Sequence, residues 1–435
     1  MNFGALAARL LTTDTRPSSP IGPIRNSVGS AFLAGYPLVF AAPRFRSLFV
    51  VLLLAGTASG MAMAYVAVWA STDFHIGPQA VSMLFVVSGL TGAIGNPLIG
   101  IVSDRYGRRR GLIVGQLAIT ALAYIGYTQA ASYSVAIALV AFSGFGVMGL
   151  VLAIVNDLIR ALPRDEQRNA ARILAAERTG WSIGIIIGPA VAAAIVASSG
   201  GTHLVFVAAA ITQLVAGTVA LTATAGERHA AGTNRPAFSG TGAGAGPAVT
   251  IPTMLVLIVA LVLVTLPSQT RTMFLPLFVT DVLGEPPGIV GPLFTLNAFV
   301  AVMTMPHVGG LADRIGAQRV LYIGAVTGAI YCVLQSQAGD YTQTLLIQML
   351  IGFSIALWST ASLIFLQQLL PGRAGMAGGL YVAVQQLTPV LSGLVLGPIA
   401  ETTGIPAAFS ATAGLCLTAL VLLLLASRAL RTARN

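Results

Sequence analysis

The side chains best suited to chemistry in this sequence are a few charged residues inside long apolar segments. Glu177 and Arg178 are adjacent, Asp157 lies at the end of the preceding segment, and Arg271 stands alone in a later one. A charge at the centre of a bilayer costs at least about 2.5–3.5 kcal/mol, so such residues normally face an internal space and act there. Glu177 is the carboxylate best placed to carry a proton. Arg178 is a candidate cavity residue or a structural partner of Asp157 or Glu177, and Arg271 faces a cavity or reaches the outer interface.

Two copies of a short Asp-Arg motif form a second candidate group. The first copy comprises Gly100, Asp104, Arg105, Gly107, Arg108 and Arg109, and the second comprises Gly309, Asp313, Arg314 and Gly316. The glycines permit a sharp turn, and Asp104 can cap a neighbouring helix N-terminus and pair with an arginine. These interactions of Asp104 would stabilise one gating state of the protein and would break in the other. The alternative is a basic loop that only sets the topology.

These residues must be positioned by membrane-spanning helices, because the composition excludes a soluble fold. Hydrophobic residues make up 56% of the 435 residues and charged residues 8%, with a mean hydropathy of +0.87, whereas a soluble domain has roughly 25% charged residues. The net charge of +10 comes from arginine without lysine. These arginines lie in short loops between apolar spans, which argues against nucleic-acid binding. The two cysteines, Cys332 and Cys416, lie in apolar runs and have no metal-ligand spacing.

Windows of about 20 mostly apolar residues predict an all-α membrane protein with twelve transmembrane helices in two six-helix halves. The predicted helices span 47–70, 79–101, 110–129, 133–157, 173–198 and 203–224, then 252–278, 289–308, 318–337, 341–367, 376–399 and 405–427. The predicted organisation is a disordered cytoplasmic tail at 1–43, a first half at 44–224, a flexible linker at 225–250, a second half at 251–428 and a cytoplasmic tail at 429–435.

The loops of this predicted topology separate by charge. Arginines fill the first tail, the linker, the last tail and the loops after the even-numbered helices. The opposite loops carry no arginine and contain the acidic residues Asp73, Asp281, Glu285, Asp340 and Glu401. By the positive-inside rule, both termini are expected to be cytoplasmic.

An internal repeat relates the two halves. Asp104 and Asp313, Gly188 and Gly397, and Arg164 and Arg373 are each separated by 209 residues. Several features at one offset indicate a duplicated six-helix unit, which is the parallel-repeat plan of two-lobed secondary transporters.

The loop from Gly100 to Arg109 and its shortened repeat resemble the signature of the major facilitator superfamily, over about residues 45–430. Arg178, ten residues before Gly188-Pro189, and the segment 367–375 resemble bacterial sugar efflux transporters of that superfamily. Gly184, Gly188 and Pro189 resemble the antiporter motif of its exporters, with Ala-Val-Ala-Ala in place of the usual following glycines. Arg271 departs from the sugar-exporter pattern.

The resemblance implies a monomeric protein of the bacterial inner membrane that exports sugars or glycosides by proton antiport and alternating access, without a cofactor or metal. Sugar recognition needs amides that form hydrogen bonds and aromatic rings that stack on the sugar. The candidates in the predicted helices are Tyr65, Trp69, Asn297, Gln348, Trp358, Gln367, Gln385 and Gln386. The alternative for the amides is to join helices, and for Trp69 it is to anchor a helix end at the interface.

Three other functions compete with sugar export. A drug exporter of the same fold is the nearest, but residues 133–157 lack the arginine usual in helix 4 of proton-coupled drug exporters. A receptor or scaffold would not need to keep the Asp-Arg loop and the intramembrane charges. An enzyme is the least favoured, because the chain has no phosphate-binding loop, zinc pattern or recognisable nucleophile and base.

Overall fold

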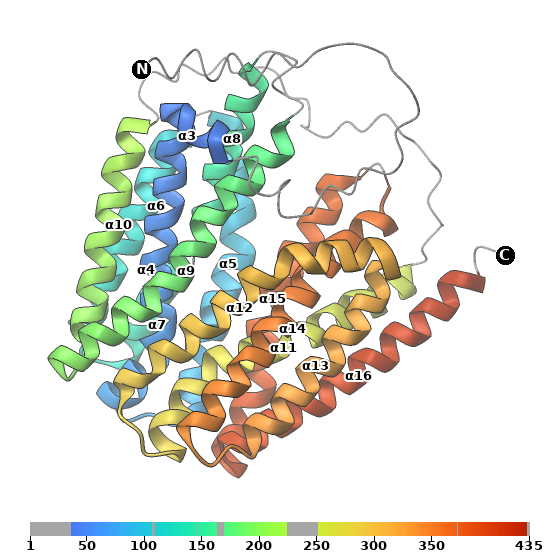
Figure 1. Ribbon diagram of the computed structural model, residues 1–435. Coiled ribbons are helices and arrows are strands. Elements are labelled where there is room, and N and C mark those ends of the chain that lie inside the picture. The colour runs from blue at the N-terminus through green and yellow to red at the C-terminus, as the bar shows by residue number, and fades with distance from the viewer. Residues whose placement is uncertain are drawn as a thin grey trace.

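The computed structural model describes residues 36–106, 109–144, 146–162, 169–223, 251–371 and 373–432, and these residues are almost entirely helical (Figure 1). The first half contains α3 (Tyr36–Ala41), α4 (Pro43–Phe74), α5 (Pro78–Tyr106), α6 (Arg109–Tyr127), α7 (Tyr133–Ser143), α8 (Met148–Ala161), α9 (Ala170–Ser199) and α10 (His203–Ala223). The second contains α11 (Ile251–Leu277), a π-helical turn (Phe278–Val282), a 3-10 turn (Pro287–Ile289), α12 (Val290–Ile315), α13 (Ala317–Ser336), α14 (Tyr341–Leu369), α15 (Ala374–Thr403) and α16 (Ile405–Thr432).

The twelve-helix prediction is confirmed, with a break in the fourth helix. Eleven helices in the described residues are long and apolar enough to cross a membrane. The shorter helices α7 and α8 divide the predicted helix 133–157 at Gly144 and Gly146. A Cβ atom on Gly144 would lie 2.8 Å from the Ser88 carbonyl oxygen of α5, so glycine permits this close approach. The Asn96 side chain accepts a hydrogen bond from the Gly146 N–H at 2.9 Å, which satisfies one backbone group released by the break.

The beginning of the first half also differs from the prediction. Residues 36–41, inside the predicted disordered tail, form α3, and α4 begins at Pro43 rather than near residue 47. Proline suits the first turn of a helix because its missing N–H has no intrahelical partner there. Residues 1–35 and the predicted linker at 225–250 lie outside the described part of the chain.

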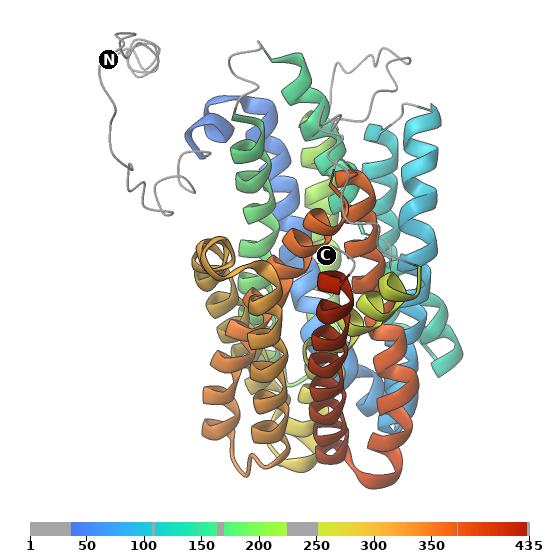
Figure 2. The same ribbon diagram turned by 90° about the vertical axis from the view of Figure 1, so that its right-hand side faces the viewer.

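The helices extend between two opposite ends of the bundle (Figure 2). We call the end at which α4, α6, α9, α11, α13 and α15 begin the linker end, because α10 stops and α11 starts there. The opposite end, at which α5, α7, α10, α12, α14 and α16 begin, is the far end.

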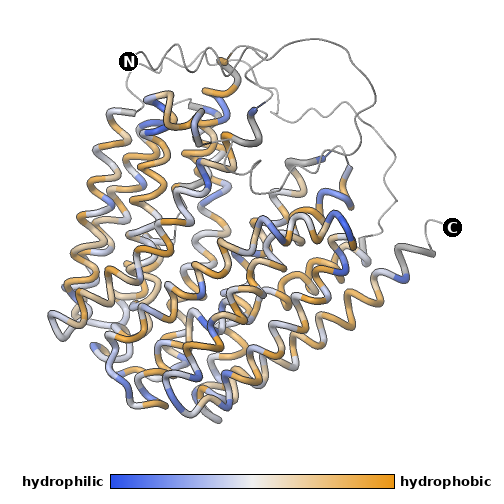
Figure 3. Tube along the Cα trace, viewed as in Figure 1, coloured by the Kyte–Doolittle hydropathy of each residue, from blue (hydrophilic) through white to orange (hydrophobic). Residues whose placement is uncertain are grey.

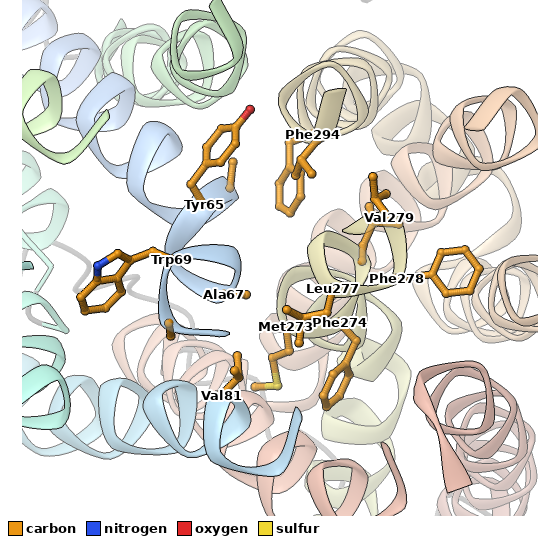
Figure 4. Packing of buried hydrophobic residues seen from close by; sticks show 14 of the residues in the cluster. Tyr65, Ala67, Trp69, Val81, Met273, Phe274, Leu277, Phe278, Val279 and Phe294 are labelled. Atoms are coloured by element: carbon orange, nitrogen blue, oxygen red, sulfur yellow. The ribbon is translucent and has the colours of Figure 1, made fainter. Parts of the chain in front are cut away.

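Among the described residues, the apolar core is continuous across the halves at the far end and divided at the linker end. There one cluster contains Trp69 and Phe206 of the first half together with Phe274 and Phe294 of the second (Figure 4). At the linker end the core consists of two separate clusters. One is built on residues of the first half, and the other on residues of α11 to α16.

Apolar residues occur along most of the length of the helices (Figure 3), and many of them are exposed on the outside of the bundle. Large exposed apolar residues occur on many helices, for example Leu122 on α6, Leu346 on α14 and Leu417 on α16. A soluble monomer rarely exposes so much contiguous apolar surface, whereas a bilayer requires it. The chain is therefore a multi-pass membrane protein.

Candidate functional site

The first Asp-Arg loop carries an ion pair within the first half. The Arg109 guanidinium at the start of α6 binds the Asp157 carboxylate of α8. It also donates to the Ala153 carbonyl oxygen at 3.2 Å and to the Ser103 hydroxyl of α5 at 3.3 Å. Arg109 thus joins α5, α6 and α8 at the linker end. Gly107, Arg108 and the side chain of Asp104 lie outside the described residues.

The second copy of the loop forms the turn without a comparable ion pair. Gly316 has a φ of 90° and connects α12 to α13, a conformation that glycine adopts without strain. Asp313 and Arg314 are exposed, and neither forms an ion pair within the described part of the chain. In this state the second copy therefore acts as a turn.

The charged pair on α9 is divided between two faces of the helix. Glu177 is fully buried, and neither carboxylate oxygen has a hydrogen-bond partner among the described residues. It lies on the face that contacts α4, because Gly180 and Gly184, three and seven residues later, pack against the α4 backbone. Arg178 is exposed and lies close enough to Tyr381 of α15 to interact with it electrostatically. Arg178 is therefore within electrostatic range of the other half, and its role as a cavity residue stays a prediction.

The antiporter-like glycines of α9 form the contact with α4. A Cβ atom on Gly184 or Gly188 would overlap the carbonyl oxygen of Leu53 or Thr57, respectively. Pro189 lies against Gly60 of α4, 3.0 Å from the position of a Cβ there. Small residues at these positions let the two helix backbones approach closely, which strengthens packing in a membrane.

The two halves meet along a seam at the far end. The Tyr65 hydroxyl donates to the Gly288 carbonyl oxygen at 3.4 Å and accepts from the Gly291 N–H at 3.3 Å. The Ser82 hydroxyl lies 3.1 Å from the Gly393 carbonyl oxygen, and the Glu401 carboxylate accepts from the Gln79 N–H at 3.1 Å. The Glu401 carboxylate thereby caps the N-terminus of α5 from the opposite half, where negative charge is favourable.

Gln386 extends this seam towards the middle of the bundle. Its side-chain nitrogen lies against Gly92 of α5, and a Cβ on Gly89 would contact the Gln386 carbonyl oxygen at 3.0 Å. Gln385 is half-buried on the same helix. Tyr65 and Gln386 are thus the predicted sugar-binding residues that the structure places at contacts between the halves.

The other predicted sugar-binding residues are dispersed. Trp69 stacks on Tyr127 with ring centroids 4.8 Å apart and is buried within the first half, so its placement favours a packing role. Gln348 is buried in the second half and donates to the Gln335 side chain at 3.2 Å. Asn297 and Trp358 are also buried, whereas Gln367 is exposed at the linker end.

Arg271 is buried near the far end of α11, where its guanidinium carbon lies 4.2 Å from the centroid of the Phe294 ring. In this state Arg271 is only 3% exposed, so the structure does not place its guanidinium at the outer interface. Neither Nε nor Nη1 has a hydrogen-bond partner among the described residues.

Asn96 and the break in the fourth helix were not expected from the sequence. The available signals were a polar amide beside Pro97 in an apolar segment and two closely spaced glycines at 144 and 146. Isolated glycines are common in membrane helices, so these signals do not predict a break. No group of three or more His, Cys, Asp or Glu side chains that could hold a metal ion occurs among the described residues.

Comparison with known proteins agrees with this architecture. The sequence matches the family model of the Major Facilitator Superfamily over residues 48–387 and 257–435. Sugar efflux transporter A of Dickeya chrysanthemi is 23% identical over 83% of this chain and 90% of its own length. Sugar efflux transporter B of Salmonella typhimurium is 24% identical over the same shares. A crystal structure of the nucleoside transporter NupG superposes with a TM-score of 0.72 at 14% identity, over 87% of this chain and 98% of that one, which shows the fold.

Proposed function

The chain belongs to the major facilitator superfamily of transporters, and on that premise we propose that it exports sugars or related small polar solutes by proton antiport. The relatives described as sugar efflux transporters cover most of the chain, which supports the substrate class. Two features of α9 support export. Arg178 belongs to the pattern that resembles sugar efflux transporters, and the close-packed Gly184, Gly188 and Pro189 resemble the antiporter motif of exporters.

The observation that carries the proposed mechanism is the asymmetry of the core. One apolar cluster unites the halves at the far end, whereas each half has its own cluster at the linker end. This arrangement is expected for one state of an alternating-access cycle, closed at the far end. Rocking of the halves about a site near the membrane centre would generate the opposite state. The two units that move would be the halves 44–224 and 251–428, connected by the linker 225–250, within a monomer.

The distribution of charge supports an orientation with the linker end in the cytoplasm of a bacterial cell. Arg44, Arg105 and Arg319 begin or end helices at the linker end. The acidic residues Asp73 and Glu401 lie at the far end. The positive-inside rule therefore places both termini in the cytoplasm and the protein in the inner membrane.

Glu177 and Arg178 are our candidates for proton coupling. An ionised carboxylate without a partner in an apolar contact is costly, and a bound proton removes that cost. Release of the proton would place a negative charge between α9 and α4, and movement of these helices would be needed to hydrate or pair it. Arg178 is adjacent in sequence and interacts electrostatically with Tyr381, so it can transmit the change to α15.

Reconstitution in vesicles tests this proposal. We expect an imposed proton gradient to drive labelled lactose or glucosides in the wild type, and Arg178→Ala to lose this movement. Arg319→Ala is the matched control, because it removes an exposed arginine at the same end of the bundle. Movement of a cationic dye without movement of sugar would establish a drug exporter instead. If folded protein moves neither compound, the proposed export function is wrong and a receptor or scaffold is favoured.

A further inference from the structure

The second half contains a buried cation for which the described residues supply no counter-charge. The Arg271 side chain is 3% exposed, and its Nε and Nη1 atoms have no hydrogen-bond partner in the described residues. Its Nη2 atom lies 3.5 Å from the hydroxyl of the neighbouring Thr272, at the limit of a hydrogen bond. No ion pair joins Arg271 to any acidic residue within the described part of the chain.

The side chains identified around Arg271 are neutral, both aromatic and polar. Phe294 of α12 presents its ring to the guanidinium, and Tyr331 of α13 is close enough to interact electrostatically. Tyr331 in turn lies beside Gln348 of α14. The Tyr331 hydroxyl and the Gln348 side chain interact with each other, but neither the hydroxyl nor the Gln348 side-chain oxygen has a hydrogen bond of ordinary geometry among the described residues. Four helices thus bring together one cation, one hydroxyl group and one amide near the far end.

An arginine cannot relieve this burial by losing its proton. A cation–π contact offsets part of the cost, but the free N–H groups still favour an anion. The guanidinium provides donors in a planar fork that matches the two oxygens of a carboxylate. Because the cluster holds a single cation, it balances one negative charge rather than two.

We infer that Arg271 binds a carboxylate on the transported solute, so that the preferred substrate is an acidic sugar with one negative charge. This inference rests on the proposed sugar export. Tyr331 and Gln348 would form hydrogen bonds with the hydroxyl groups beside the carboxylate. Phe294 lies next to Tyr65 at the seam between the halves (Figure 4). Opening of that seam would uncover the side of the cluster that Phe294 covers, which gives the solute a route to the far end.

The test compares D-glucuronate with D-glucose, which differ only in the carboxylate at carbon 6. Each sugar is used to compete with labelled lactose for transport in vesicles at pH 7. In the wild type we expect D-glucuronate to inhibit at a concentration at least about tenfold lower, the effect of one hydrogen-bonded charge pair. We expect Arg271→Gln to reduce this ratio to within about twofold of one. Arg319→Gln removes an exposed arginine and is expected to keep the wild-type ratio.

If D-glucose and D-glucuronate inhibit the wild type at about the same concentration, the inference is wrong. This outcome needs no variant, so the inference can be tested even if Arg271→Gln does not fold. An unchanged ratio in folded Arg271→Gln also overturns it. Direct binding of labelled D-glucuronate to purified protein separates the inference from the proposed function. Binding that Arg271→Gln abolishes, in protein that moves no lactose, would support the carboxylate site and contradict lactose export. Transport of lactose and glucose without binding of D-glucuronate would support export and contradict the carboxylate site.

Discussion

A single added methyl group at Gly393 is expected to shift the protein towards the state open at the far end. Gly393 of α15 packs on α5 at the seam, where a Cβ would lie 2.8 Å from the Ser82 carbonyl oxygen and would overlap the Val86 side chain. Because a carbonyl oxygen of the backbone cannot move alone, Gly393→Ala must separate α5 from α15. Overpacking of this kind costs about 1–3 kcal/mol, which corresponds to about a 5- to 150-fold change in the ratio of two states.

Labelling of a cysteine at Val81 measures this shift. Val81 is fully buried in the far-end cluster, and the two native cysteines are also buried. The rate of maleimide labelling of Val81→Cys should therefore follow the fraction of protein open at the far end. We expect Gly393→Ala to raise this rate about 5- to 150-fold.

Gly379→Ala is the control for this experiment. It makes the same change on the same helix, at a position with no heavy atom within 4 Å of the added Cβ, so it reproduces any gain in helix propensity. Equal labelling rates in the two variants would refute our reasoning that the seam holds the far end closed.

Three further predictions concern coupling, the ion pair and helix packing. Glu177→Gln should abolish sugar movement driven by a proton gradient, because the amide cannot release a proton. The variant should still exchange sugar when the pH is the same on both sides of the membrane. Gradient-driven movement in this variant would contradict the role of Glu177 in coupling. A double-mutant cycle with Arg109→Gln and Asp157→Asn should give a coupling energy of about 1 kcal/mol in thermal unfolding, since side-chain exposures of 15% and 30% leave the pair partly screened. An energy near zero would show that the pair does not stabilise this state. Gly188→Val should destabilise the folded protein by at least about 1–3 kcal/mol. The control Gly414→Val should leave the melting temperature nearly unchanged, because no heavy atom lies within 4 Å of a Cβ at that position. Equal melting temperatures of the two variants would contradict the close contact of α9 with α4.

The helices and their arrangement in two halves were predictable because lipid imposes simple rules. A span must be long and apolar, and its backbone must be hydrogen-bonded internally. The repeat at 209 residues identified the halves independently of hydropathy. The break between α7 and α8 was missed because it depends on Asn96 of another helix, which accepts the hydrogen bond from Gly146.

The candidate site was less predictable because its geometry depends on which face of a helix each side chain occupies. Arg178 is exposed and interacts electrostatically with Tyr381 of the other half, whereas its neighbour Glu177 is buried against α4. A rotation of 100° per residue separates the two side chains. Trp69 finds a stacking partner in Tyr127, 58 positions away in the sequence. Likewise, the pairing of Asp157 with Arg109 arises from the approach of α8 to α6, which hydropathy cannot reveal.

Distances across both ends of the bundle test the alternating-access account most directly. Spin labels on exposed residues would be placed in two pairs, His75 with Thr402 at the far end and Gly111 with Gln368 at the linker end. Pulsed electron paramagnetic resonance in lipid nanodiscs would then compare acidic with neutral pH, with and without sugar. We predict two populations in which the far-end distance lengthens as the linker-end distance shortens. Distances that stay fixed under every condition, or that lengthen together at both ends, would contradict the account.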